Sequence, residues 1–457
     1  MKIIIVGLGQ TGTTLVKALA DEHYDITVVD KDRALVDRIT DRYNVNGVTG
    51  SGASRETLLA AGADTADAIV ALTHIDEINL LSCMQAKALG TRRSGARLLL
   101  PDFVHESDSL KEQYDIDYFV KPKSDIAEEI FRNIGMPGFM KLEGYWGDSI
   151  QIIDLNILDD SPLAGRTLSD LKHSMKLDML VVSVIRDDKL YIPDGNFTLK
   201  VGDNIGIAAA HENMGITLQA LGITKRTVKR IVIVGGGITA GYLMEMLEKD
   251  FKNITILEND VHRCRELMEK YPSAKIAYSG GEILDVLEEE QVSEADCIIS
   301  LTDNDETNLV ISMYAWSCRI PSILTRVDKP EHVKLLHRVN IDITVSVTEL
   351  SVLKMIRFVR NYEMGDADNE IGKFYNIAGN RAEIMEFNAT GSFRGANIPF
   401  GSKEFRLKKD VLITSIIRNG QLIIPDGTAY IKEGDCVVIA SAKHCRIRNL
   451  NEILDMH

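Results

Sequence analysis

The chain has 457 residues, 45% hydrophobic and 26% charged, a composition typical of soluble globular proteins. Its 52 Lys and Arg residues are outnumbered by 67 Asp and Glu residues, and the formal net charge of -15 argues against binding to nucleic acid phosphates or to an anionic membrane surface. No apolar run approaches the roughly 20 residues that span a bilayer, and the six cysteines form no C-x-x-C pair. We therefore expect a reduced, cytoplasmic protein without a structural zinc site.

The first hundred residues alternate between short apolar runs and stretches with apolar residues at helical spacing. Residues 2–6 and 25–30 predict parallel strands buried on both faces, and residues 11–23 between them predict a helix. Further strands are expected near 46–50, 68–73 and 96–100. This alternation predicts an α/β fold, a Rossmann-like parallel sheet with helices on both faces.

A glycine-rich turn, Gly7-x-Gly9-x-x-Gly12, joins the first strand to the first helix. In this position the first glycine permits a tight turn, the second lets the backbone approach a pyrophosphate, and the third lets the helix pack on the strand. The helix N-terminus then offers free N–H groups to phosphates. Asp30 is placed to accept hydrogen bonds from an adenosine ribose, and its charge would repel a 2′-phosphate. The turn therefore predicts an NAD(H) site, and the alternative is a turn that serves packing alone.

Polar residues follow the next strands of the predicted sheet. Thr73 is expected to face a ligand, because the carboxyl ends of strands form the ligand crevice of open parallel sheets. Asp76 and Asn79 stand where the next helix should begin, so we expect them to cap that helix and stabilise its dipole. Arg97 lies in an apolar stretch, where a guanidinium is costly unless paired. It is interpreted either as a phosphate contact or as part of a structural ion pair.

The rest of the first half is of a different kind. Residues 124–136 predict a helix with an apolar stripe at Ile126, Ile130 and Ile134, which must be buried against another part of the protein. Short strands with turn signals such as Pro193-Asp194-Gly195 follow, and they predict a small α+β domain with a structural role.

The same order of features returns in the second half. Gly235, Gly237 and Glu258 follow Gly7, Gly9 and Asp30 at one constant separation, with Ala240 in place of the third glycine, and Thr302 and Arg326 correspond to Thr73 and Arg97. A second linking helix, with apolar residues at Leu350 and Leu353, is expected after the second sheet. The repeat predicts two tandem copies of a two-domain unit, joined near 221–229. The expected segments are two nucleotide-binding N-lobes at 1–123 and 228–345, two crossover helices at 124–139 and 346–364, and two C-lobes at 140–222 and 368–457.

The stretches "VGLGQTGTTL", "DITVVD" and "LTHIDEINL", followed by "IPDG" and "VGD" and then repeated, resemble the peripheral TrkA subunits of bacterial Trk potassium-uptake systems. The halves resemble regulator-of-potassium-conductance (RCK) domains. The resemblance implies a peripheral protein at the inner face of the membrane, a homotetramer that forms a ring of eight lobes. This ring would bind NAD(H) and ATP or ADP and regulate a membrane potassium-transporting subunit.

The resemblance also implies which residues bind nucleotide, with neither a catalytic residue nor a metal ligand among them. Ser51 and Ser279 depart from the Asp that much of the wider family has at these positions. The residues assigned to the first site are Gly7, Leu8, Gly9, Gln10, Thr11, Gly12, Asp30, Ser51, Thr73, His74 and Arg97. Those assigned to the second site are Gly235, Gly236, Gly237, Ile238, Thr239, Glu258, Ser279, Thr302 and Arg326.

Two other classes of function stay open. An NAD-dependent oxidoreductase would need an acid or base beside the nicotinamide, and the sequence offers no evident His, Lys or Tyr for this role. A nucleotide-sensing scaffold that acts without a transporter is the second alternative.

Overall fold

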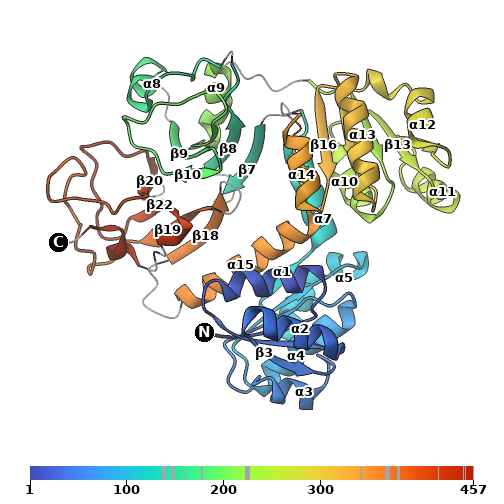
Figure 1. Cartoon of the computed structure of the whole chain (residues 1–457), viewed down its shortest axis with the longest axis horizontal. Helices are drawn as coiled ribbons and strands as arrows, with labels where there is room; N and C mark the ends of the chain where they lie inside the picture. Colours follow the sequence, from blue (N-terminus) through green and yellow to red (C-terminus); the bar gives the residue numbers. More distant parts are fainter. Residues whose placement is uncertain are drawn as a thin grey trace. The chain divides into compact units, whose positions relative to one another are not determined.

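The computed structural model describes residues 1–135, 140–145, 150–159, 161–175, 179–221, 227–339, 341, 343–365, 371–377, 381–419, 421–445, 447 and 449–455. Its contacts divide the chain into two compact units, and each unit combines parts of both repeats (Figure 1). Unit 1 consists of Met1–Ile134 and Val228–Tyr362, and unit 2 of Gly135–Thr227 and Glu363–His457. The expected segment boundaries stay predictions, and positions 136–139, 222–226 and 366–370 near them lie outside the described residues.

The first sheet of unit 1 is parallel, with strand order β3-β2-β1-β4-β5-β6. Because β1 pairs with β2 on one side and β4 on the other, the winding of the chain reverses at β1, and the ligand crevice of such sheets lies at this point. The strands are β1 (Lys2–Val6), β2 (Asp25–Asp30), β3 (Asn46–Thr49), β4 (Ala68–Ala71), β5 (Arg93–Arg97) and β6 (Tyr118–Val120). The helices are α1 (Gln10–Ala20), α2 (Arg33–Tyr43), α3 (Arg55–Ala60), α4 (Asp76–Leu89), α5 (Pro101–His105) and α6 (Ser107–Tyr114).

The fifth strand begins earlier than the apolar pattern indicated. It was expected at 96–100, but β5 covers Arg93–Arg97. The small residues Ser94 and Gly95 are buried in it, and a side chain at Gly95 would lie 3.0 Å from the ring of Phe358. Small residues give no apolar signal, so the pattern pointed to the leucines that follow the strand.

The second sheet of unit 1 repeats the first, with order β14-β13-β12-β15-β16-β17 and parallel pairing throughout. The prediction of two Rossmann-like sheets is confirmed. The strands are β12 (Arg230–Val234), β13 (Asn253–Glu258), β14 (Lys275–Tyr278), β15 (Cys297–Ser300), β16 (Ser322–Arg326) and β17 (Thr344–Val345). The helices are α10 (Ile238–Leu247), α11 (Val261–Lys270), α12 (Ile283–Glu289), η1 (Val292–Glu294), α13 (Asp305–Ser317) and α14 (Pro330–His337).

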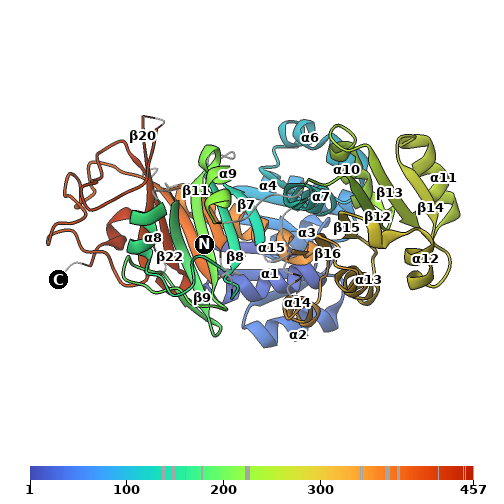
Figure 2. The same ribbon diagram turned by 90° about the horizontal axis from the view of Figure 1, so that it is seen from above.

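The two linking helices of unit 1, α7 (Pro122–Asn133) and α15 (Val347–Gly365), each pack on the other repeat (Figure 2). Helix α7 lies against α10, and Ile126 and Ile130 of the predicted stripe are buried on it. Ile134 is also buried, but it follows the last residue of the helix. On α15 the expected Leu350 and Leu353 are only half-buried. Among the described side chains its buried apolar residues are instead Val352, Met355, Ile356 and Val359, which share a core with Ile5 of β1, Leu15 of α1 and Val28 of β2.

Unit 2 contains two small sheets that are antiparallel, with orders β10-β9-β11-β8-β7 and β18-β19-β22-β20-β21. Ile152, Val182 and Ala208 of the first sheet share a core with Ile384, Val438 and Ala440 of the second. The first half supplies β7 (Met140–Tyr145), β8 (Ile150–Asn156), α8 (Leu168–Met175), β9 (Met179–Arg186), β10 (Lys189–Tyr191), β11 (Asn204–Ala210) and α9 (His211–Ala220). The second half supplies β18 (Ile371–Ile377), β19 (Ala382–Asn388), β20 (Val411–Arg418), β21 (Gln421–Ile423), β22 (Cys436–Ala442), η2 (Lys443–Cys445) and η3 (Leu450–Ile453).

The described part of the chain contains neither a disulfide bond nor a helix suited to cross a membrane. All six cysteines are free thiols. Among the described residues, none of the helices combines the length and the apolar character that crossing a bilayer requires.

Candidate functional site

The first candidate site is a cleft of about 370 Å³ at the carboxyl ends of β1 and β4, where the winding of the first sheet reverses. Several candidates from the sequence meet there, although a binding role for each stays a prediction. The candidates that line the cleft are Gly7, Gly9, Gln10, Thr11, Asp30, Thr73, His74 and Arg97. Lys31, Gly50 and Gly52 also line it.

The three glycines of the first turn serve different purposes. Gly7 has a φ of +93°, and a Cβ atom there would lie 2.8 Å from the backbone nitrogen of Thr73. A Cβ atom on Gly12 would lie 1.9 Å from the carbonyl oxygen of Gly7. Gly9 differs, because a Cβ atom there would meet nothing within 4 Å. Gly7 and Gly12 therefore make the close turn possible, and Gly9 leaves the space above the helix N-terminus open.

Three candidates of the first site lie beside the cleft and do not line it. Leu8 is 2% exposed and belongs to the core of the first sheet. Gly12 lies beneath the turn, close to the Gly7 carbonyl. The hydroxyl of Ser51 accepts a hydrogen bond from the backbone nitrogen of Ala53 at 3.3 Å, and its neighbours Gly50 and Gly52 line the cleft in its place.

Asp30 holds the turn and faces the cleft. Its Oδ2 atom accepts a hydrogen bond from the backbone nitrogen of Leu8 at 2.7 Å, and its Oδ1 atom accepts one from Asp32 at 3.0 Å. A carboxylate has about four lone-pair positions, so both oxygens keep acceptor capacity for the hydroxyl groups of a ligand.

Asn79 fixes the loop that follows β4. Its Oδ1 atom accepts hydrogen bonds from the nitrogen and the hydroxyl of Thr73, at 2.8 and 2.7 Å. Its amide nitrogen donates to the carbonyl oxygens of Thr73 and Arg97, at 2.9 and 3.0 Å. The buried Asp76 accepts from the backbone nitrogens of Leu99 and Leu100. The prediction that these side chains form capping bonds to the helix is therefore wrong, because both fasten neighbouring loops and none of the described side chains caps α4.

Arg97 offers a positive charge that is not paired with a carboxylate. Its Nη2 atom donates to the carbonyl oxygen of Thr73 at 2.8 Å, and its Nη1 atom lies 3.5 Å from the hydroxyl of Thr11. Within the described residues it forms no ion pair. Burial lowers the pKa of its guanidinium, and the charge of Asp76 opposes that shift. A half-buried guanidinium beside a glycine turn is suited to bind an anion.

The second candidate site is a cleft of about 650 Å³ at the corresponding place in the second sheet. Gly237, like Gly9, leaves its Cβ position open. Glu258 is buried, and its carboxylate accepts from the backbone nitrogens of Gly236 and Asp260, at 2.7 and 2.8 Å. The sequence candidates that line this cleft are Gly235, Gly237, Ile238, Thr239, Glu258, Ser279, Thr302 and Arg326, whereas Gly236 packs against Leu267 and Glu258.

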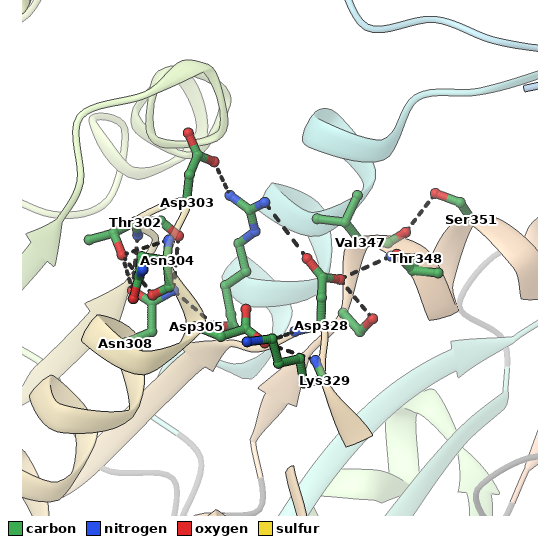
Figure 3. Close-up of polar contacts among 12 residues, drawn as sticks. Thr302, Asp303, Asn304, Asp305, Asn308, Asp328, Lys329, Val347, Thr348 and Ser351 are labelled. Atoms are coloured by element: carbon green, nitrogen blue, oxygen red, sulfur yellow. Dashed lines mark hydrogen bonds and ion pairs between the residues drawn. The ribbon is translucent and has the colours of Figure 1, made fainter. Parts of the chain in front are cut away.

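Arg326 differs from its counterpart Arg97 because it is paired. Its Nη1 atom lies 2.6 Å from Asp303 Oδ1, and its Nη2 atom lies 3.7 Å from Asp328 Oδ2, so the guanidinium lies between two carboxylates (Figure 3). Asp328 also accepts hydrogen bonds from the hydroxyl of Ser346 and the backbone nitrogen of Thr348, at 3.0 and 3.2 Å. Of the two interpretations of these arginines, the structural ion pair applies to Arg326.

Each cleft is completed by residues of the other repeat. Val347 and Thr348, at the start of α15, line the first cleft together with Arg326 and Asp328. Residues Leu99, Pro122 and Lys123 of the first repeat line the second cleft. Sequence reasoning assigned Arg326 to the second cleft alone and missed the other residues, since it treated each repeat separately. The only available signal was the pair of amphipathic linking helices, whose apolar stripes required a neighbouring lobe.

Comparison with known proteins identifies related sequences. Residues 3–120 and 231–347 match the family model of the TrkA-N domain, and residues 152–235 match that of the TrkA-C domain. The Trk system potassium uptake protein TrkA homolog 1 of Methanosarcina mazei is 30% identical over 450 residues, 96% of this chain and 97% of that protein. The Trk system potassium uptake protein TrkA of Haemophilus influenzae is 30% identical over 445 residues, 96% of this chain and 95% of that protein.

Solved structures share the fold at low sequence identity. The GsuK channel bound to NAD is 16% identical, with a TM-score of 0.63, over 97% of this chain and 77% of that chain. The GsuK RCK domain is also 16% identical, with a TM-score of 0.61, over 97% of this chain and 92% of that chain.

Proposed function

Because the chain belongs to the TrkA family of potassium-uptake proteins, we propose that it is the regulatory subunit of such a system. Its clefts bind NAD(H) and adenine nucleotides such as ATP and ADP, and they thereby set the activity of a membrane potassium-transporting partner. The subunit acts at the cytoplasmic face of the membrane as a homotetramer, a ring of eight lobes.

The observation that carries this proposal is that Arg97, beside an open glycine turn, has no carboxylate partner among the described residues. The first N–H groups of α1 have no partner within the helix, and no side chain in the described part of the chain caps them. Together with the open position at Gly9 and the guanidinium of Arg97, they fit the phosphates of a nucleotide. The free acceptor capacity of Asp30 fits a ribose, and its charge favours NAD(H) over NADP(H). The resemblance in fold to a channel bound to NAD is consistent with this ligand class.

Regulation follows from the composite walls of the clefts. A ligand in the first cleft lies beside Thr348 of the second repeat, and a ligand in the second cleft lies beside Lys123 of the first. Binding therefore depends on how the two nucleotide lobes are set against each other. A ligand that has different affinities for two such arrangements shifts the population between them, and the ring passes that shift to the transporter.

Calorimetric titration tests the binding sites. A matched pair of variants, Gly9→Phe and Gly237→Phe, places a large side chain in each open glycine position. We expect the wild-type chain to bind NAD, NADH, ATP or ADP at two sites and each variant to lose one of them. The absence of nucleotide binding by the wild-type chain would contradict the proposal.

Potassium uptake in cells tests the regulatory role. Cells that carry Gly9→Phe should take up potassium abnormally although the variant chain still folds, and normal uptake would contradict regulation through this cleft. The oxidoreductase alternative is tested by mixing the chain with NADH and candidate carbonyl substrates. A sustained loss of absorbance at the nicotinamide band would favour the enzyme.

A further inference from the structure

The two clefts receive residues from equivalent positions of the opposite repeat. Arg97 pairs with Val120 across β5 and β6, and Arg326 pairs with Val345 across β16 and β17. Three residues further along the chain, these equivalent strands lead to Lys123 and Thr348. Thr348 lines the first cleft and Lys123 lines the second. Each repeat therefore contributes a residue from the equivalent position to the cleft of the other repeat, but only the second cleft receives a charged residue from that position.

The arginines of the two clefts also differ in charge pairing, and here it is the first cleft that has the available positive charge. In the first cleft Arg97 has no carboxylate partner among the described residues, and it is available to an anion. In the second cleft Arg326 is held by Asp303 and Asp328, which neutralise its charge. A phosphate in the second cleft would compete with these carboxylates for the guanidinium. The second cleft thus lacks the free arginine that distinguishes the first.

Lys123 supplies the charge that Arg326 does not. Its side chain is half-buried, and within the part of the chain that the structure describes it forms neither a hydrogen bond nor an ion pair. Burial lowers the pKa of its ammonium group, while the charge of Asp303 acts against that shift and the charge of Arg326 adds to it. A half-buried ammonium without a partner is unfavourable in the protein alone, and an anionic ligand would relieve this.

We propose that Lys123, contributed by the first repeat, is the phosphate-binding cation of the second cleft. This inference rests on the proposed function and assigns the ligand contact within it. The second cleft therefore discriminates between nucleotides and the uncharged nucleoside through a residue of the other lobe. Because that contact spans the lobes, phosphate binding in the second cleft requires Lys123 and the second sheet to be held together.

The test compares ADP with adenosine in the full chain, with the first cleft blocked by Gly9→Phe. In this background Lys123→Met should weaken ADP binding about 10-fold to 100-fold, as expected for a lost hydrogen bond to a charged group. Adenosine binding should stay within twofold of the parent. Lys123→Arg keeps the charge and should restore most of the ADP affinity.

A matched control removes a lysine that belongs to the second lobe itself. Lys329 forms an exposed ion pair with Glu306 and does not line the cleft, so Lys329→Met changes the net charge by the same amount. It should leave ADP binding unchanged, and thermal unfolding should show that both variants are folded.

The possible failures can be told apart. If Lys123→Met binds ADP as tightly as the Gly9→Phe parent, Lys123 only balances the charge of Asp303 and the inference is wrong, while the proposed function stands. An equal loss of ADP and adenosine affinity would also overturn it, because the residue would then act on the shape of the cleft. If the parent itself binds no nucleotide, both the nucleotide function of the second cleft and the role of Lys123 are wrong.

Discussion

Arg360 donates a hydrogen bond from its Nε atom to Glu22 Oε2 at 2.9 Å, and its Nη2 atom contacts the other carboxylate oxygen. Arg360 belongs to α15 of the second repeat, and Glu22 follows α1 of the first. Only 9% and 13% of the two side chains are exposed. A nearly buried ion pair therefore fastens the helix of one repeat to the lobe of the other.

Replacing Arg360 with Met should destabilise unit 1 strongly. The carboxylate of Glu22 would stay in its sheltered position without this cation, and breaking such a pair costs about 3 to 5 kcal/mol. Urea unfolding of the wild-type and variant chains measures the difference. The control is Asp37→Asn, which breaks the exposed pair with Arg33 and should cost less than about 1 kcal/mol. Equal losses in the two variants would contradict the importance of burial.

Alanine at Gly7 should lower the stability of the chain, whereas alanine at Gly9 should lower only its affinity for nucleotide. Gly7→Ala forces a side chain into a position with φ of +93° and against the backbone of Thr73, which should cost about 1 to 3 kcal/mol of stability. Gly9→Ala meets no atom within 4 Å, so the chain should unfold as the wild type does and lose affinity only for nucleotide. Thermal unfolding and calorimetry separate the two effects. A melting temperature lowered equally by both changes would be inconsistent with this division.

Stability should depend on pH through Asp117. Burial opposes the ionisation of this carboxyl, but hydrogen bonds from Arg93, Ser94 and Lys87 outweigh burial and hold its pKa below the ordinary value. A carboxyl whose pKa is lower in the folded state contributes stability above its unfolded pKa, and this contribution is lost as the pH falls through the folded pKa.

Asp117→Asn should therefore reduce the free energy of unfolding at pH 7, and its difference from the wild type should shrink below about pH 4. Urea unfolding of both chains at several pH values measures this. A difference that does not change with pH would show that the charge of Asp117 is not responsible.

The sequence allowed the two sheets to be predicted because their signals are local. Continuous apolar runs such as Lys2–Val6, the glycine turn and the acid at Asp30 each follow from spacing along a few residues. The repeat then supplied the second copy without further assumptions. The same locality explains the misplaced fifth strand, where buried Ser94 and Gly95 carry no apolar pattern.

The completed clefts could not be predicted, because they depend on contacts between residues far apart in the chain. Asn79 looked like a helix cap, and only the folded loop shows that it joins Thr73 to Arg97. The pairing of Arg326 likewise depends on Asp303 and Asp328, two acids that are absent from the corresponding places around Arg97. Repeats with similar sequence motifs can therefore differ in charge at the site itself.

Asp328 should influence the first cleft although it belongs to the second repeat. Its Oδ1 atom accepts hydrogen bonds from the Ser346 hydroxyl and the Thr348 nitrogen, and it thereby holds the start of α15. Asp328→Ala removes this cap, a loss of about 1 kcal/mol, and should speed hydrogen exchange at residues 346–351. Because Thr348 lines the first cleft, the affinity for adenosine there should fall about fivefold. The uncharged nucleoside is used because Asp328 also pairs with Arg326, so its loss changes the charge of the cleft. Calorimetry in a Gly237→Phe background isolates that cleft, and Glu306→Gln, which breaks only the exposed pair with Lys329, should leave it unaffected. Faster exchange with unchanged affinity would show that the start of α15 does not contribute to the first cleft.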